Sequence, residues 1–598
     1  MVRQIRAAGH RVSFLYSIQE SCTNKDNTDT LREVDAFYLH MYDHAIREAE
    51  TARALMRVSL ERAGLNYELD SWYQADLDDL IRTIYERDPF DVMLGNYIWM
   101  SKAFDAVPDT VIKIQQTHDM MSDRMMRLAR QGMPPSFFSV TPADEGRGLD
   151  RADINIALQC GEEIYFRGLT DKIVRTLQHA PCDIPFAPRP LPAGRKLRVG
   201  FIGSDNAVNV RTATLLVDAL VRMTSVSSQI DLCIAGNICT AFRGVAPPFI
   251  KLLGACDNLG DIYRAMDVMV NPVEDGTGLK IKSVEALQYH IPIVMTAAGS
   301  EGLLSPYHFH RCASVTEVVG YLKMIAENPR LLTLMQSAGD KVLHAYRDRL
   351  ARAADALISP QTVIDAQRAR TAATRQAVCG DRVLQFYQPE NAVALRLPVA
   401  DGVTELAARI PEESVWLDIG SRSGEFALFV AATGRARKVI AIEWDPDFIE
   451  QLKLNVLRNK MQDIVDMRFL GYAPDAAPGY GVLRPASGRS KAVFDESDGV
   501  TPGATVPFAP LAQLIGGDMC VNAVNIDTVE PVETLAAIRG VIEKYAPLLF
   551  IRADAAEAET VRRWAQENGC DVDTAGDGVT VVLTPVSRRP DAEIVNIA

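Results

Sequence analysis

The stretch from Asn271 to Leu303, NPVEDGTGLKIKSVEALQYHIPIVMTAAGSEGL, decides the fold of the first half of the chain. An apolar run leads into a loop with Gly276, Thr277 and Gly278, and that loop opens directly into a helical pattern. Glycines let backbone amides approach a ligand, and the positive end of a helix favours phosphate. The segment therefore predicts a diphosphate site at a strand-to-helix turn.

Two lysines and a glutamate mark the start of this predicted helix. Lys280 and Lys282 lie in its first turn, where a cation is unfavourable beside the helix dipole unless an anion is shared with it. Glu285 follows at a spacing that brings its carboxylate toward ribose hydroxyls. A solvated helix face behind a flexible glycine loop is the alternative, but this cluster is more specific than an isolated G-x-G-x-x-G.

Alternating apolar runs and helical stretches extend in both directions, which is typical of α/β sheets. A Pro-rich segment over 181–192 and a polar, Ala/Arg-rich helical stretch over 347–375 divide these runs into three series. The runs begin at Asp91, Thr110 and Asp153 in the first series, at Lys196, Ile230, Asp267 and Ile291 in the second, and at Val415, Val439, Val521 and Leu548 in the third. The predicted fold class is α/β, with three Rossmann-like domains.

These series set the expected domain limits. At 598 residues the chain is too long for one hydrophobic core. We expect a first domain over residues 1–190, a second over 191–345, a helical linker over 346–382 that acts as a tether, and a third domain over 383–598.

Composition limits the classes of partner. A hydrophobic content of 48% and a charged content of 23% predict a chain that folds throughout, and a net charge of -14 disfavours wholesale nucleic-acid binding. No run approaches a membrane span and the start lacks the apolar core of a signal peptide, so we expect a cytoplasmic protein. The ten cysteines form no CxxC pair and no Cys/His cluster, so we expect neither disulfides nor a metal site.

The second series resembles the donor-binding domain of glycosyltransferase family 4. The matching motifs are the glycine loop with its Glu-Ala-Leu helix, a Pro-x-Val-x-Thr strand and a Gly-x-x-Gly-Leu turn; here they span 276–287, 292–296 and 299–303. The resemblance extends upstream through Gly203 and Asn209 and covers roughly residues 1–345. It implies a GT-B fold and a retaining transfer from a nucleotide sugar without a bound metal.

The resemblance also implies roles for individual residues of the donor domain. Lys280 and Lys282 would stabilise the leaving diphosphate electrostatically, with Arg211 as a third cation. Glu285 matches the second Glu of the family's paired-Glu pattern, which binds the nucleoside ribose. The first Glu of that pattern falls at Thr277, so recognition of the donor sugar's hydroxyls must differ here. Gly203, Gly276 and Gly278 would lie against the donor.

In the first domain, His118 follows a predicted strand and matches a histidine that the family turns toward the interdomain cleft. A structural histidine is the alternative. Acidic positions over 144–145 and 162–163, with Asp153, fit the family's pattern and are interpreted as structural. The chain opens on a helix end and what would be the family's second strand, so we expect the first strand of this domain to be missing.

A second nucleotide site is predicted where an apolar strand ends in Asp418 and the turn through Gly420 and Gly424 opens a helix. This D-x-G-x-x-x-G turn suits S-adenosylmethionine, and Glu443 ends the next strand about twenty residues later, where a carboxylate takes both ribose hydroxyls. A dinucleotide dehydrogenase is the alternative, but its second glycine would fall at Arg422.

The stretch over 443–459 resembles the FkbM family of O-methyltransferases, and the resemblance covers roughly residues 383–585. It places Asp527 as a catalytic residue in the strand that the family writes Lys-Ile-Asp. This chain has Asn525 in place of the lysine and Pro531 in place of a following glycine, with one residue inserted.

The sequence as a whole predicts a bifunctional transferase. It would transfer sugar from a nucleotide sugar to a glycan or glycolipid acceptor, and it would methylate a glycan hydroxyl with S-adenosylmethionine. Lipid-linked acceptors leave peripheral membrane contact open. The alternative is a glycosyltransferase that carries a non-catalytic, methyltransferase-like binding module.

Overall fold

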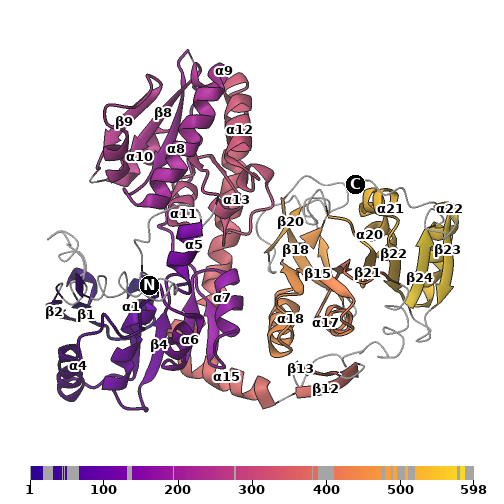
Figure 1. The fold of residues 1–598 in the computed structure, drawn as a ribbon, viewed down its shortest axis with the longest axis horizontal. Coiled ribbons are helices and arrows are strands. Elements are labelled where there is room, and N and C mark those ends of the chain that lie inside the picture. The colour runs from indigo at the N-terminus through magenta and orange to yellow at the C-terminus, as the bar shows by residue number, and fades with distance from the viewer. Residues whose placement is uncertain are drawn as a thin grey trace. The chain divides into compact units, whose positions relative to one another are not determined.

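The structure, a computed structural model, is drawn in Figure 1. It describes residues 2–17, 31–43, 45, 48–49, 66–130, 138–192, 194–256, 258–274, 278–372, 374–379, 382–387, 410–469, 471–472, 479–486, 489–493, 505–509, 519–528, 530–574 and 580–585. The chain divides into two units, the first comprising Met1–Leu303 and Phe309–Gln367, the second Leu304–His308 and Arg368–Ala598.

The first unit begins with a parallel sheet in the order β3-β4-β5-β6. Every residue of β5 is buried, which suits a near-continuous apolar run in a parallel strand covered on both faces. The strands are β3 (Val92–Asn96), β4 (Ile112–Gln116), β5 (Ile154–Ala157) and β6 (Ile173–Thr176), and β1 (Ser13–Ser17) pairs separately with β2 (Ala36–His40). The helices are α1 (Val2–Ala7), α4 (Asp76–Arg87), η1 (Ile98–Ala106), α5 (Arg124–Arg130), α6 (Pro142–Asp150) and α7 (Cys160–Arg167).

A second parallel sheet of the first unit has the order β11-β10-β7-β8-β9. Because the chain passes from β7 to β8 on one side and later to β10 on the other, the carboxyl end of β7 is a topological switch point, where ligands bind in open α/β sheets. The strands are β7 (Leu197–Ile202), β8 (Ile230–Ala235), β9 (Ile250–Gly254), β10 (Val268–Asn271) and β11 (Ile293–Met295). The helices are α8 (Ala207–Arg222), α9 (Thr224–Ser227), η2 (Asn237–Phe242), α10 (Leu259–Ala265), α11 (Ile281–Gln288), η3 (Ala298–Ser300), η4 (His308–His310), α12 (Val315–Glu327) and α13 (Leu331–Ala353).

The helices that follow this sheet correct the expectation of a tether over 346–382. The end of α13, then α14 (Asp355–Ile358) and α15 (Pro360–Ala372), supply apolar side chains to one core with β4 and β5. Leu350 and Ala356 are buried there together with Ile114 and Ile154. The polar, Ala/Arg-rich composition conceals an apolar helical face, so residues up to Gln367 belong to the first unit.

The second unit contains a sheet in the order β16-β15-β14-β21-β22-β24-β23, in which only β24 runs antiparallel to its neighbours β22 and β23. Its strands are β14 (Ser414–Ile419), β15 (Ala436–Ile442), β16 (Val465–Arg468), β21 (Ala523–Ile526), β22 (Leu548–Arg552), β23 (Cys570–Thr574) and β24 (Thr580–Pro585). This mostly parallel sheet is Rossmann-like, so the predicted α/β fold class is confirmed in both units.

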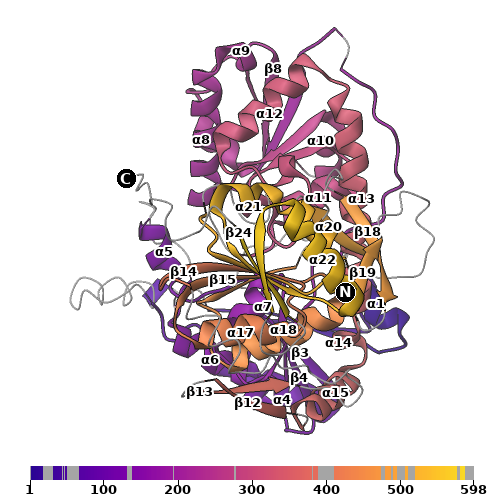
Figure 2. The ribbon, with the colours of Figure 1, turned by 90° about the vertical axis from the view of Figure 1, so that its right-hand side faces the viewer.

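Helices cover both faces of this sheet, as Figure 2 shows. Along β14, Leu417 and Ile419 pack into one core with helices α20 and α22, while Trp416 packs into another with α17 and α18. The period of two therefore feeds two apolar layers from one strand. The helices are α17 (Glu425–Ala432), α18 (Pro446–Arg458), α20 (Pro531–Ala537), α21 (Arg539–Tyr545) and α22 (Ala555–Glu567).

Two smaller sheets of the second unit lie outside the series predicted from sequence. An antiparallel hairpin pairs β12 (Thr374–Cys379) with β13 (Arg382–Tyr387). A four-stranded sheet comprises β17 (Gly471–Tyr472), β18 (Gly479–Ala486), β19 (Arg489–Val493) and β20 (Thr505–Ala509). None of the described helices has the length and apolar character needed to cross a lipid bilayer.

Packing of α13 against the first sheet predicts different costs for two leucines of that helix. Leu350 is 8% exposed and Leu334 is 69% exposed. Leu350→Ala should lower the free energy of unfolding of the first unit by about 2–4 kcal/mol because it leaves a cavity, whereas Leu334→Ala should cost less than about 0.5 kcal/mol. Urea denaturation followed by hydrogen exchange in β4 and β5 measures both. Equal costs would contradict the packing described here.

Candidate functional site

The turn between β10 and α11 lies at the carboxyl end of the second sheet. Gly276 and Thr277 lie outside the described residues, while Gly278 has a φ of 83° and its carbonyl oxygen accepts a hydrogen bond from Lys280 Nζ at 2.8 Å. Lys280 is the N-cap residue of α11, and Lys282 lies in the first turn. The side chain of Lys280 is therefore folded back over the turn that the sequence identified as a phosphate site.

Lys282 is a buried cation. Its Nζ donates a hydrogen bond to Asn209 Oδ1 at 2.9 Å and lies 5.0 Å from the centroid of the Phe201 ring. Burial and, to a smaller extent, the neighbouring Lys280 lower the pKa of Lys282 to about 8. A buried ammonium that contacts a neutral amide and an aromatic ring is stabilised when an anion approaches.

Backbone rather than side chain is presented where β7 ends. Gly203 follows β7, and a methyl group added at Gly236 would lie 2.3 Å from the Gly203 carbonyl oxygen. The ends of β7 and β8 therefore approach so closely that only glycine fits at position 236, where φ is 97°. Arg211 lies on α8 with its side chain exposed.

Glu285 lies one turn further along α11. Its Oε2 accepts a hydrogen bond from the Tyr263 hydroxyl at 2.7 Å. Tyr263 is fully buried and its ring stacks on Tyr289, with centroids 5.0 Å apart. Burial and the Glu285 carboxylate raise the pKa of Tyr263, so the hydroxyl stays a donor and fixes the orientation of the carboxylate.

His118 lies just beyond the end of β4 in a strained conformation. Its φ is 65°, and Tyr97, just beyond the end of the neighbouring strand β3, has a φ of 66°. The two rings stack with centroids 4.2 Å apart, and a ring nitrogen of His118 lies 2.9 Å from Asn96 Oδ1. Burial lowers the pKa of His118, so the ring is neutral at pH 7.

Strain of this kind persists only where the surroundings enforce it, and it gathers at functional positions. Sequence reasoning singled out His118 and missed Tyr97 and Asn96. The available signal was position: Tyr97 follows the end of β3 as His118 follows the end of β4, and parallel strands bring these ends to one edge.

The two sheets of the first unit meet at the turn that contains Gly278 and leads into α11. A methyl group added at Gly278 would lie 3.2 Å from Asp119 Oδ1, and Gln159 Nε2 donates a hydrogen bond to Glu301 Oε1 at 3.2 Å. Glu162, in the first turn of α7, is 2% exposed. The sequence interpreted Glu162 as structural, but its charged neighbours are Asp119, Glu301 and Lys280, which belong to this junction.

The other acidic positions of the first domain support the local fold. Glu145 accepts hydrogen bonds from the backbone amides of Met121 and Ser122 at 2.7 and 3.1 Å. Asp153 Oδ2 accepts one from the Lys113 amide at 2.9 Å. Both carboxylates therefore tie a loop or strand to its neighbour.

The second candidate site lies at the carboxyl end of β14. Gly420 and Gly424 have φ angles of 76° and 86°, and a methyl group at either would lie 2.4 Å from the Asp527 carbonyl oxygen or 2.5 Å from Leu452 Cδ1, respectively. Asp418 is 1% exposed; its Oδ1 accepts a hydrogen bond from Asn525 Nδ2 at 2.7 Å, and its Oδ2 has no partner among the described residues. Burial raises the pKa of Asp418 to about 7.

Glu443 closes this turn from the end of β15. Its Oε2 accepts a hydrogen bond from the Arg422 amide at 2.6 Å, and its Oε1 accepts two, from the Trp444 and Asp445 amides, both at 2.8 Å. Burial raises the pKa of Glu443 to about 7 even though these amides lower it. The carboxylate thus ties the Gly420–Gly424 turn to β15.

Asp527 lies immediately after β21 between two arginines. Its Oδ2 lies 3.9 Å from Arg422 Nη1 and 3.5 Å from Arg552 Nη1. Asn525 pairs with Asp418 in register across β14 and β21. Asp418, Asn525 and Asp527 therefore lie together at the carboxyl ends of β14 and β21.

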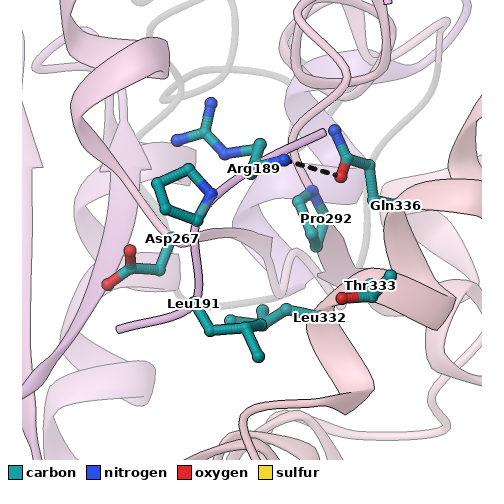
Figure 3. Close-up of a pocket in the computed structure, with 8 residues that line it drawn as sticks. Arg189, Leu191, Asp267, Pro292, Leu332, Thr333 and Gln336 are labelled. Carbon is teal, nitrogen blue, oxygen red and sulfur yellow. Dashed lines mark hydrogen bonds between the residues drawn. The ribbon is translucent and has the colours of Figure 1, made fainter. Parts of the chain in front are cut away.

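The second sheet of the first unit also borders a pocket away from Lys280, shown in Figure 3. It is lined by Arg189 and Pro190 before β7, Asp267 before β10 and Pro292 before β11, so it lies at the amino ends of the strands. The Arg189 amide donates a hydrogen bond to Gln336 Oε1 at 3.3 Å. The pocket is therefore at the opposite end of the sheet from Lys280. Among the described residues, no three His, Cys, Asp or Glu side chains are placed to hold a metal ion.

Comparison with known proteins identifies one segment directly. Residues 196–308, which contain this sheet, match the family described as glycosyl transferases group 1. No curated protein matches the sequence closely enough to count as a relative.

Solved structures resemble the chain in fold. Anabaena Alr3699/HepE in complex with UDP is 13% identical, covers 62% of this chain and 95% of its own, and has a TM-score of 0.38. Precorrin-6y C5,15-methyltransferase from Geobacter metallireducens is 14% identical over 32% of this chain and 92% of its own, with a TM-score of 0.22. The M. jannaschii tRNA m1G37 methyltransferase is 12% identical, covers 35% of this chain and 53% of its own, and has a TM-score of 0.22.

Proposed function

We propose that the first unit transfers a sugar from a nucleotide sugar to a glycan or glycolipid acceptor. The observation that carries this proposal is the burial of Lys282 beside Lys280 at the start of α11, where a helix dipole repels cations. A diphosphate offsets both the dipole and the two ammonium groups. The match of residues 196–308 to a glycosyltransferase domain supports the same assignment.

Different residues around the turn bind different parts of the donor. Lys280 and Lys282 bind the diphosphate and stabilise the charge that develops on it as the glycosidic bond breaks. Glu285, oriented by Tyr263, binds the ribose hydroxyls. Gly203, Gly276 and Gly278 would lie against the donor, and Arg211 would add positive charge from α8. His118, held neutral and stacked on Tyr97, faces the transferred group.

We propose that the second unit binds S-adenosylmethionine and methylates a glycan hydroxyl. The residues fit this cofactor: Gly420 and Gly424 adopt the left-handed backbone and close contacts of a tight strand-to-helix turn, and Asp418 has a buried oxygen without a partner among the described residues. Glu443 would take the ribose hydroxyls, and the cofactor would supply an electrophilic methyl group. Asp527 would accept the proton of the acceptor hydroxyl.

One observation favours the alternative, a binding module without methyl transfer. Asp527 lies between Arg422 and Arg552, so its carboxylate is already engaged by two cations that an acceptor hydroxyl would have to displace. Glycosyl transfer in the first unit does not depend on which alternative holds. Fusion of either module raises the local concentration of a shared glycan at the other.

The donor proposal predicts a pH profile for diphosphate binding. Lys282 titrates near pH 8 without ligand, and a bound diphosphate favours its charged form. The affinity for a nucleoside diphosphate should therefore be highest below pH 8 and fall as pH rises to 9.5, by up to about tenfold per pH unit. Calorimetric titration with UDP, GDP and ADP measures this profile.

Variants isolate the contribution of Lys282 to that profile. Lys282→Arg should flatten it because arginine does not titrate, and Lys282→Met should weaken binding roughly tenfold to a hundredfold. Lys251→Met, on the exposed surface of β9, is the matched control and should bind as the unaltered chain does. A diphosphate affinity that Lys282→Met leaves unchanged would refute the assignment.

The cofactor proposal predicts one S-adenosylmethionine bound per chain. Glu443→Ala should weaken that binding at least about tenfold because it removes the ribose acceptor and loosens the turn. Glu543→Ala is the matched control, since Glu543 lies exposed on α21. Calorimetry measures binding and radiolabelled methyl transfer to glycans measures turnover. Absence of binding would exclude methylation, whereas binding without transfer would favour the module without turnover.

A further inference from the structure

A buried glutamate at the start of α7 is acted on by Lys280, which belongs to the turn that leads into α11. Glu162 is 2% exposed, and its Oε2 accepts a hydrogen bond from the Leu158 amide at 3.1 Å. Its Oε1 has no hydrogen-bond partner among the described residues. A buried polar atom left without a partner is costly, so its retention calls for an explanation.

The surroundings of Glu162 belong to the donor side of the junction. Asp119, Glu301 and Lys280 are the charged groups that act on its carboxyl group. Lys280 Nζ lies 2.8 Å from the Gly278 carbonyl and 3.9 Å from Glu301 Oε2, and Asp119 approaches Gly278. Arg124 pairs with Asp119 at 3.0 Å on the first-sheet side. The free oxygen of Glu162 is thus in the neighbourhood of the turn that would hold the diphosphate.

The chemistry of this oxygen favours a hydroxyl as its ligand. The carboxylates nearby do not converge as a metal site requires, since the described residues contain no such group. Burial, with Asp119 next, raises the pKa of Glu162 to about 8, so at pH 7 the group mostly holds its proton. A carboxylic acid both donates and accepts hydrogen bonds, as a sugar hydroxyl does.

We propose that Glu162 binds a hydroxyl of the sugar that is transferred, and so helps to select the donor. This inference rests on the proposed function of the first unit. The sugar is attached to the diphosphate, so a group beside Lys280 on the opposite sheet meets the sugar rather than the nucleoside. Glu162 therefore supplies a sugar contact from the first sheet, outside the glycine loop and α11.

The test compares nucleotide sugars with their nucleoside diphosphates. Calorimetry at pH 7 on the full chain gives the ratio of the Kd for UDP to that for UDP-glucose, UDP-galactose or UDP-N-acetylglucosamine, and of the Kd for GDP to that for GDP-mannose. We expect at least one nucleotide sugar to bind tighter than its diphosphate. Glu162→Ala should reduce that ratio at least about tenfold and leave diphosphate binding within about threefold.

Three further variants separate a sugar contact from a structural role. Glu162→Gln imitates the protonated acid and should keep the ratio within about threefold. Glu162→Met keeps the side-chain volume but cannot form the hydrogen bond, so it should reduce the ratio as much as Glu162→Ala does. This variant keeps the test valid if Glu162→Ala fails to fold. Asp261→Ala, exposed on α10, is the control and should change nothing.

The outcomes distinguish failure of the sugar contact from failure of the proposed glycosyl transfer. If diphosphates bind and Glu162→Met keeps the full ratio, or if no nucleotide sugar exceeds its diphosphate, the sugar contact is wrong and the donor site stands. An effect of Glu162→Ala on the KM for the acceptor alone would also overturn it. If no diphosphate binds, the proposed function and this inference both fall.

Discussion

Burial of the Lys282 ammonium at the positive end of α11 is the constraint on which the donor domain depends. A charged group that contacts a neutral amide and an aromatic ring is costly in a low-dielectric site. Lys280 folds back over Gly278 nearby, and Glu285 is held in place by Tyr263. An anion at this end of α11, such as the proposed diphosphate, would relieve the unfavourable charge.

The alignment of parallel strands is sufficient to bring the other candidate site residues together. In the first sheet, the ends of β3 and β4 bring Tyr97 and His118 into a stack. In the second unit, the register of β14 with β21 brings Asp418 against Asn525. Both units therefore build their candidate sites at the carboxyl ends of strands, where helix amino termini and glycine turns meet polar side chains.

Local pattern was sufficient to predict strands such as β4, β10 and β14 and the turn through Gly420 and Gly424, because apolar runs and glycines at strand ends are properties of short segments. It was insufficient for the packing of Leu350, whose apolar face is diluted by arginine and alanine, and for β17 to β20, which follow no long apolar run. The surroundings of Glu162 were beyond prediction for a different reason. Asp119 and Lys280, which act on its carboxyl group, are distant in sequence and approach it only through the fold.

The central claim is that the chain carries two separate ligand sites, one at the start of α11 and one at the turn between β14 and α17. Hydrogen–deuterium exchange of the full chain, with a nucleoside diphosphate and S-adenosylmethionine added singly and together, locates both at once. The account predicts protection over residues 278–285 by the diphosphate alone and over 418–425 by S-adenosylmethionine alone, and both when the ligands are combined. Protection of one unit by both ligands, or competition between them, would contradict it.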